Sequence, residues 1–465
     1  MGTRILPFRA SAAMLVMTSA APAADVLGQT ASPVAFVNVN VIPMDREGAV
    51  LTGQTVIVRA GRIEVLGPSG STAVPEGATR VQASGRFLIP GLAEMHGHIP
   101  AVGADGPNPR WAEDVLFLYV AGGALTVRGM QGHPSHLELR ERVESGALIG
   151  PRLYLSGPSM SGNSVPDAAT AERLVREYHE AGYDHLKVHE GLSRESYDAI
   201  VRTASELEMR WGGHVSQVVG VDGALTARQA TIDHLDDYIE AAQRDGSPAL
   251  AMSGAERAAA LPLNVDESKI PDLARRTAAA GVAVVPTMAL WERLRGAHAP
   301  ETLTGMPELH YVPQSMVDQW SNSAGQAHER NPRESSSAEV RFRNSMLEAL
   351  SDAGVTILMG TDAPQVFSVP GFSLRREAVA MQEAGMTPWQ ILQSGTVAVA
   401  SHFGTEAEAG TIAAGKRADM ILLEANPLDD IDNIGRIAGV VVNGNWLPQS
   451  EIDRRLEEIA SRNGR

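Results

Sequence analysis

The sequence predicts an α/β fold, a (β/α)8 TIM barrel accompanied by a small β-sandwich domain that is built from both chain ends. Between residues 90 and 404, short apolar segments alternate with amphipathic helical segments, a pattern typical of a parallel sheet. Residues 33–89 and 405–450 instead contain short strands separated by turn signals. We therefore expect a barrel at 90–404, a composite β domain from 33–89 plus 405–450, and a C-terminal tail at 451–465.

The two flanking β segments carry hairpin signals. Residues 55–68 contain two strands around Ala60-Gly61, and GVVVNGNWLP contains two strands around Asn443-Gly444. Because these segments lie on either side of the barrel in sequence, a single domain assembled from both ends is the simplest interpretation.

Eight apolar segments provide the strands that a closed barrel requires. They are expected at residues 92–98, 125–129, 152–156, 184–189, 211–216, 231–235, 282–287 and 355–362. Amphipathic helices lie between them, and two end at Gly182 and Gly354, as helices often end at glycine. Residues 236–280 and 289–334 are longer than the pattern needs; they either shape substrate access or form solvated excursions.

Composition excludes several classes of partner. The net charge of −16 argues against binding nucleic acid or an anionic membrane, because both require a basic surface. The chain has no cysteine, so neither disulfides nor thiolate metal ligands are available.

The N-terminus resembles a secretory signal peptide at residues 1–24. Arg4 and Arg9 precede an apolar stretch that ends in Ala21-Pro22-Ala23, an A-x-A cleavage pattern. The stretch is too short to span a membrane. We expect an exported, periplasmic protein with no membrane attachment after signal cleavage; a disordered alanine-rich tail is the alternative.

Six residues of metal-ligand type stand where predicted barrel strands end, the face at which barrels build their active sites. They are His96, His98, Lys187, His214, His234 and Asp362. His96 and His98 are two positions apart on a strand, so both imidazoles point to the same face and form half of a site for Zn²⁺ or a similar ion. His214, His234 or Asp362 alone would suggest a structural role, but the set favours a metal site.

Lys187 is one of only three lysines among 39 basic residues, and it occupies an inward strand position. A buried cation is costly and would repel metal ions. Two explanations survive: a catalytic amine, or a lysine whose charge is reversed by reaction with CO₂ to an anionic carbamate. The nearby histidines and Asp362 favour the carbamate.

Three further residues are candidates for contacts to the substrate. His189 shares the inward face of Lys187 and could contact the substrate carbonyl, or simply pack. Tyr238 could donate a hydrogen bond to an oxyanion. Arg128 could pair with a substrate carboxylate or with an acid in the core.

PGLAEMHGH, Lys187, the two later histidines, GTDA and GTIAAGKRADMILLEANP together resemble the metal-dependent amidohydrolase superfamily. The resemblance spans residues 33–450. Within the superfamily the chain resembles the binuclear, carboxylated-lysine group, which includes bacterial prolidase-like and imidazolonepropionase-like exported hydrolases.

This resemblance implies two divalent metal ions, with zinc expected and Mn²⁺, Co²⁺ or Fe²⁺ also compatible. It places one ion on His96, His98 and Asp362 and the other on His214 and His234. Carboxylated Lys187 and a hydroxide would bridge the ions, and Asp362 would relay a proton while the bridging hydroxide attacks the carbonyl.

The implied reaction is hydrolysis of a C–N amide bond in a small molecule: an N-acyl amino acid, a dipeptide-like amide or a cyclic amide. Hydrolysis of an ester, lactone or phosphotriester at the same site is the first alternative, because substrate loops vary on one fold. A non-catalytic binding protein is the second. A homo-oligomer is compatible with the sequence, which does not decide the oligomeric state.

Overall fold

The computed structural model describes residues 32–103 and 108–464. The predicted signal peptide, residues 1–24, lies outside the described residues, and export to the periplasm stays a prediction. Among the described helices, none combines the length and the apolar character needed to span a membrane.

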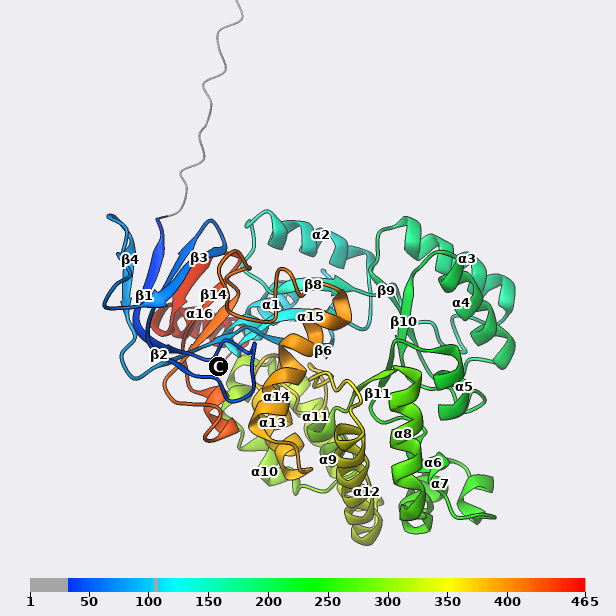
Figure 1. The fold of residues 1–465 in the computed structure, drawn as a ribbon. Coiled ribbons are helices and arrows are strands. Elements are labelled where there is room, and N and C mark those ends of the chain that lie inside the picture. The colour runs from blue at the N-terminus through cyan, green and yellow to red at the C-terminus, as the bar shows by residue number, and fades with distance from the viewer. Residues whose placement is uncertain (1–31, 104–107, 465) are drawn as a thin grey trace, which may run out of the picture. The chain divides into compact units, whose positions relative to one another are not determined.

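One eight-stranded sheet takes its strands from both ends of the chain, as the blue and red strands of Figure 1 show. Its strands are β1 (Val34–Val41), β2 (Leu51–Arg59), β3 (Arg62–Pro68), β4 (Thr79–Gln82), β5 (Phe87–Pro90), β13 (Met420–Leu423), β14 (Ile437–Val442) and β15 (Asn445–Pro448). The strand order is β15-β14-β13-β5-β1-β2-β3, and β4 pairs with β1. The antiparallel pairing of β5 with β13 is the point at which the two chain ends meet.

Both predicted hairpins form in this sheet. β2 pairs with β3 and β14 pairs with β15, each antiparallel. The turn residues Ala60, Gly61, Asn443 and Gly444 all have φ between 48° and 79°, the left-handed conformation that tight hairpin turns require. The expected separation into a sandwich domain and a barrel domain stays a prediction.

Seven parallel strands coincide with seven of the eight segments predicted for a barrel. Three form one sheet: β6 (Leu92–Gly97), β7 (Ala124–Gly129) and β8 (Arg152–Leu155). Four form another: β9 (His185–Val188), β10 (Arg210–Gly213), β11 (Thr231–Asp233) and β12 (Ala283–Val285). In both sheets, neighbours in sequence are neighbours in space.

Isolated pairings connect the two parallel sheets. Ser156, just after β8, bridges to His185 at the start of β9. On the other side, Ile357 bridges to Val284 of β12, and the amide of Met95 in β6 donates to the carbonyl of Met359 at 2.9 Å. Pairing therefore runs from each strand to the next and returns to β6, which is the order expected in a closed barrel.

The eighth predicted strand, residues 355–362, departs from expectation because it is not a continuous strand. It makes isolated contacts with β12 and β6 instead of a regular ladder. Two local features interrupt it. A Cβ on Gly360 would lie 2.8 Å from the backbone nitrogen of His96, and Asp362 has a φ of 60°. Only glycine fits at position 360, and the left-handed φ of Asp362 is incompatible with extended β geometry, so the segment leaves its strand path at this residue.

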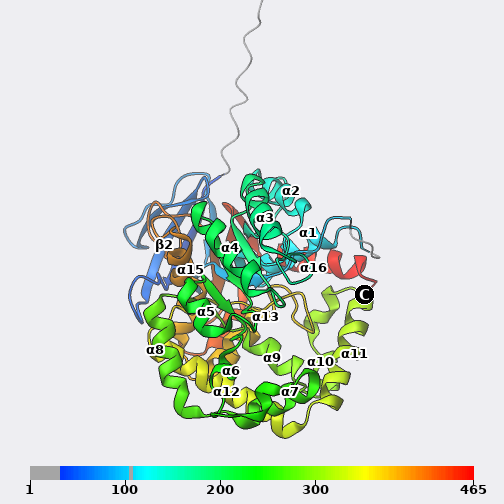
Figure 2. The same cartoon turned by 90° about the vertical axis from the view of Figure 1, so that its right-hand side faces the viewer.

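Helices follow the parallel strands, and α3, α4, α5, α8 and α12 can be followed in Figure 2. The helices outside the two long insertions are α1 (Trp111–Ala121), α2 (Pro134–Glu144), α3 (Ala168–Glu180), α4 (Arg194–Glu206), α5 (Gly220–Ala227), α12 (Arg333–Asp352), α13 (Ser373–Glu383), α14 (Pro388–Gly395), α15 (Val397–Phe403) and α16 (Gln449–Arg462). α3 begins where Asp167 accepts a hydrogen bond from the Thr170 amide, and it ends before Gly182, whose φ is 83°. Most of the predicted tail forms α16, which buries Ile452, Leu456 and Ile459.

The two insertions are helical as well. Residues 236–280 contain α6 (Tyr238–Ala241), α7 (Gly254–Ala260) and α8 (Ile270–Ala280). Residues 289–334 lie largely in α9 (Met288–Leu294), α10 (Pro300–Thr304) and α11 (Gln314–Arg330). Short 3-10 turns complete the chain at Pro248–Ala251, Leu261–Asn264, Glu267–Lys269, Pro307–Tyr311 and Ile431–Gly435.

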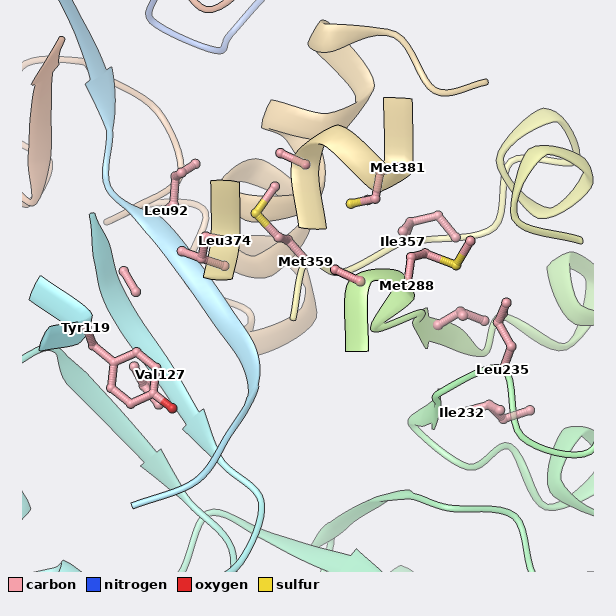
Figure 3. Packing of buried hydrophobic residues seen from close by; sticks show 14 of the residues in the cluster. Leu92, Tyr119, Val127, Ile232, Leu235, Met288, Ile357, Met359, Leu374 and Met381 are labelled. Atoms are coloured by element: carbon pink, nitrogen blue, oxygen red, sulfur yellow. The ribbon is translucent and has the colours of Figure 1, made fainter. Parts of the chain in front are cut away.

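The main core lies between the parallel strands and the helices that follow them. Figure 3 shows Leu92 of β6 and Met359 near Leu374 and Met381 of α13. All four are at most 1% exposed. Full burial of such side chains contributes about 1.5–3 kcal/mol each, so this packing holds the strand ends in place.

Candidate metal centre

Four histidines at the ends of β6, β10 and β11 share one hydrogen-bonding pattern. Each uses Nδ1 within the protein: His96 with Asp233 at 2.6 Å, His98 with Gln131 at 2.9 Å, His214 with Asp236 at 2.6 Å and His234 with Thr287 at 2.8 Å. An oxygen acceptor on Nδ1 keeps the proton there and leaves the lone pair of Nε2 free to bind a ligand.

The four imidazoles lie together. Ring centroids are 5.5 Å apart for His96 and His98, 4.4 Å for His96 and His234, and 4.6 Å for His214 and His234. Because these rings come from three different strands, only the packing of the parallel sheets can bring them together.

Asp362 and Lys187 complete the cluster. Oδ1 of Asp362 lies 2.6 Å from Nε2 of His98 and 3.7 Å from Nε2 of His96, and its Oδ2 lies 3.8 Å from Nε2 of His234. Nζ of Lys187 is 2.9 Å from Nε2 of His96. The structure therefore brings together all six residues that the sequence singled out.

Several ligand atoms in this cluster are buried without a hydrogen-bond partner among the described residues. They are Nε2 of His234 and, with the His98 proton held on Nδ1, the facing atoms Nε2 of His98 and Oδ1 of Asp362, which then have no proton between them. An unsatisfied buried polar atom costs about 1–3 kcal/mol, so such a cluster calls for a ligand. Imidazole nitrogens and a carboxylate are donors that divalent zinc and related metals accept, and the residues present fit metal binding.

Burial sets the protonation of these groups. It lowers the pKa of His96 and of His234 well below the usual value, and neighbouring cationic groups act in the same direction. Burial also lowers the pKa of Lys187, although the Asp362 carboxylate opposes the shift. The imidazoles of His96 and His234 are consequently neutral, as metal ligation requires, and the amine of Lys187 loses its proton more readily than a lysine in water.

Left-handed backbone at the strand ends positions two of the candidate ligands. His234 has a φ of 63° and Asp362 a φ of 60°, and Thr287, which holds His234, has a φ of 47°. Such conformations cost about 1–3 kcal/mol each in non-glycine residues and gather at functional sites. The chain leaves its extended path at these residues, which aims their side chains into the cluster.

Carboxylates that the sequence reasoning missed support the histidines. Asp233 is fully buried, and its Oδ2 accepts hydrogen bonds from His96 and, at 2.7 Å, from Nη2 of Arg128. Arg128 therefore pairs with a core acid, one of its two predicted roles, and does not face the substrate. The signal that could have revealed Asp233 and Asp236 is their adjacency to His234 in TIDHLDD.

Glu94 was also missed, and it fixes β6 to the irregular eighth segment. Its carboxyl group accepts from the backbone amides of His96 and Thr361 at 3.0 and 2.7 Å. Burial raises the pKa of Glu94 to about 8, which favours the protonated acid at neutral pH. These contacts align the ligands of one segment with those of the other.

The expectation for Tyr238 is wrong. Its side chain is fully buried away from the cavity, and its hydroxyl pairs with Oγ1 of Thr277 in α8 at 2.7 Å. The left-handed turn at His234, Leu235 and Asp237 directs Tyr238 to the helices instead of the ligand cluster. It cannot serve as the expected oxyanion donor from this position.

A cavity of about 880 Å³ opens above the cluster, and His98, Lys187, His214, His234 and Asp362 all line it. His189 also lines the cavity, as expected, with its ring 4.2 Å from that of His214. The volume suits a small organic molecule.

Comparisons with known proteins find relatives in both sequence and fold. Ochratoxinase of Aspergillus niger is 25% identical over 378 residues, 74% of this chain and 71% of that protein. Its crystal structure matches with a TM-score of 0.62 at 18% identity, covering 90% of this chain and 96% of that one.

Two further solved structures share the fold. A bottromycin amidohydrolase has a TM-score of 0.71 and 23% identity and covers 93% of this chain and 91% of its own. A Xaa-Pro dipeptidase with bound methionine in its active site has a TM-score of 0.64 and 18% identity over 90% and 100% of the two chains. A sequence model described as the amidohydrolase family matches residues 87–447. The chain therefore belongs to the amidohydrolase family and is an enzyme that hydrolyses C–N bonds.

Proposed function

We propose that this enzyme hydrolyses an amide bond of a small molecule at a two-metal centre in the mouth of a (β/α)8 barrel. The two parallel sheets would be two arcs of that barrel, joined by the pairings at Ser156 and Ile357. The observation that carries the proposal is the convergence of four Nδ1-anchored histidines on Lys187 and Asp362.

The donor set divides into two groups. His96, His98 and Asp362 would hold one ion, and His214 and His234 the other, with Lys187 between them. When bound, two divalent ions would polarise the amide carbonyl and make water acidic enough to act as a nucleophile near neutral pH. Zinc fits a nitrogen-rich donor set of this kind.

Lys187 can serve as a ligand only if its charge is reversed. Its side chain is 2% exposed, and burial lowers its pKa, so a neutral amine is accessible to attack CO₂. In that reaction the amine nitrogen forms a bond to the carbon of CO₂ and releases one proton. The carbamate that results offers two oxygens and one negative charge in place of a cation.

Asp362 is the residue placed to move a proton. Gln365 donates a hydrogen bond to its Oδ2 at 2.7 Å, while its Oδ1 faces Nε2 of His98 and receives no proton from it when the His98 proton lies on Nδ1. Asp362 would accept the proton of the attacking water and deliver it to the leaving nitrogen. A bond forms between the water oxygen and the carbonyl carbon, the C–N bond breaks, and the products are an acid and an amine. His189, at the cavity wall, would contact the substrate.

A metal titration combined with a substrate panel tests this proposal. Freshly purified enzyme should contain about two divalent ions per chain and should release amines from small amides faster than it cleaves matched esters or lactones. Chelation should abolish turnover, and added Zn²⁺ or Mn²⁺ should restore it. Protein that binds no divalent ion and turns over no member of the panel would instead support a binding role.

A further inference from the structure

The cavity has two chemically distinct walls. One wall is polar: Ser159, Ser161 and Asn163 follow β8, and Glu190 follows β9. The amide of Gly162 donates to the carbonyl of Glu190 at 3.1 Å, so these two loops form one continuous surface. Asn163 is exposed and lines the cavity, so its side-chain amide can reach a ligand there.

The other wall is apolar and comes from α9. Leu290, Trp291 and Leu294 line the cavity from this helix. The helix is firmly anchored, because the Glu377 carboxylate accepts hydrogen bonds from the amides of Met288 and Ala289 at 2.8 and 2.9 Å.

Two arginines hold the ring of Trp291. The guanidinium of Arg343 lies 4.7 Å from the ring centroid and that of Arg295 lies 5.6 Å away. Arg343 is 6% exposed and donates to the carbonyl of Pro286 at 2.8 Å, and Arg295 pairs with Glu339. The indole is therefore fixed before a ligand arrives, which reduces the entropy lost when a flat apolar group packs against it.

Apart from the metal centre, the cavity lining offers few positive charges that could stabilise a carboxylate on the substrate. Lys187 is the one lysine in its lining and belongs to the ligand cluster, and no arginine lines it among the described residues. Arg293, on the same helix as Trp291, is turned to Oγ of Ser368 at 2.8 Å. Glu190, by contrast, presents an exposed carboxylate. A substrate carboxylate that leaves water to contact the polar wall would find no cationic partner there and would be repelled by the carboxylate of Glu190.

We propose that the cavity selects amides that carry an aromatic or similar apolar group for the α9 wall and a neutral or cationic group for the polar wall, with Trp291 and Glu190 as the specificity-determining residues. This inference rests on the proposed amide hydrolysis and narrows it. Among the substrate classes that the sequence suggests, amides without a free carboxylate are preferred over N-acyl amino acids.

Kinetics on matched substrates tests the preference. The wild-type enzyme should cleave the benzoyl–nitrogen bond of N-benzoyl-alaninamide and N-benzoyl-ethylenediamine with a kcat/KM about tenfold above that of N-benzoyl-alanine. Glu190→Gln should reduce this ratio about threefold or more, and the control Glu195→Gln, on the exposed start of α4, should not change it. Trp291→Ala should raise KM for benzoyl substrates about tenfold and have little effect on N-acetyl-alaninamide, while Trp291→Phe should recover most of the loss.

Binding of uncleaved probes separates this inference from the proposed reaction. Phenylbutylamine should bind more weakly to Glu190→Gln than to wild type, and phenylbutyrate more tightly, by about threefold each. If these affinities change as expected while no amide is cleaved, the proposed function fails and the specificity of the cavity stands. Equal probe affinities in the two proteins would overturn the role of Glu190. Metal content is measured on each variant, because the potential ligand atoms of Glu190, His214 and Asp236 all lie within 4.8 Å of one another. Loss of metal in Glu190→Gln would show that Glu190 belongs to the metal centre and would overturn its role in specificity.

Discussion

Replacement of Asp233 by asparagine should weaken both the fold and the metal centre. Asp233 and Arg128 form an ion pair at 2.7 Å whose side chains are 0% and 3% exposed. The same carboxylate oxygen holds Nδ1 of His96 at 2.6 Å. Burial opposes ionisation of Asp233, but Arg128, together with His234, Lys187 and a hydrogen bond from Thr231, outweighs it and keeps the pKa of this carboxyl below its usual range. Asp233 is thus a charged anchor between the core and a candidate ligand.

The size of the effect follows from this burial. The asparagine side chain would keep the shape of the aspartate but leave the Arg128 guanidinium without a counter-charge, a loss that typically costs about 3–5 kcal/mol in a buried pair. His96 would lose the anionic acceptor on Nδ1, and loss of such a partner weakens metal binding about 10- to 100-fold. Urea unfolding of chelator-treated protein measures the first effect, and competition with a metal chelator measures the second.

Two comparisons make this prediction decisive. Glu177→Gln, which breaks an exposed pair with Arg173, should cost less than about 1 kcal/mol. The double variant R128M/D233N should be more stable than D233N, because it removes the unpaired buried cation. A loss below about 1 kcal/mol in D233N, together with unchanged metal affinity, would refute the reasoning.

Three further predictions follow from other parts of the molecule. Lys187→Ala should lose metal and activity and regain part of both when a short carboxylate such as propionate is added. The control is Lys416→Ala, which should keep both, because Nζ of Lys416 donates only to the carbonyls of Glu406 and Ala409. Full activity and two metals in Lys187→Ala would disprove the bridging role. Burial raises the pKa of Glu377 from 4.5 to about 7, so between these pH values the folded state holds a proton that the unfolded chain has lost. The free energy of unfolding should therefore fall by up to about 3 kcal/mol as the pH rises from 4.5 through 7. In urea unfolding measured at several pH values, Glu377→Gln should show a smaller decline of the unfolding free energy. A pH profile identical to that of the wild type would contradict the role given to Glu377. Gly122→Ala should destabilise the fold by about 1–3 kcal/mol or more, because the new Cβ would lie 2.2 Å from the Gly371 carbonyl carbon, while Gly70→Ala meets no atom within 4 Å and should differ little in Tm.

Local chemistry made much of the fold predictable. The hairpin dipeptides Ala60-Gly61 and Asn443-Gly444 formed the expected turns because few residues tolerate that backbone conformation. Seven strand segments were found from apolar runs between helical patterns. The eighth was predicted as a regular strand, and no local signal revealed that Gly360 must approach His96 closely.

The sequence by itself determined the α/β pattern, the β-structure at both chain ends, and the six candidate ligand residues, because strand ends and ligand types are local properties. The pairing of both ends in one sheet was decided by tertiary structure. Tertiary structure decided which atoms of those residues are held by hydrogen bonds and which are left to bind a metal. The Nδ1 contacts of the histidines reach Asp233, Gln131, Asp236 and Thr287, and most of these partners lie far along the chain. Tertiary structure also paired Tyr238 with Thr277 and Arg128 with Asp233, and it brought an apolar helix and polar loops to the lining of one cavity. Those outcomes depend on burial and on distances between segments that no pattern along one segment encodes.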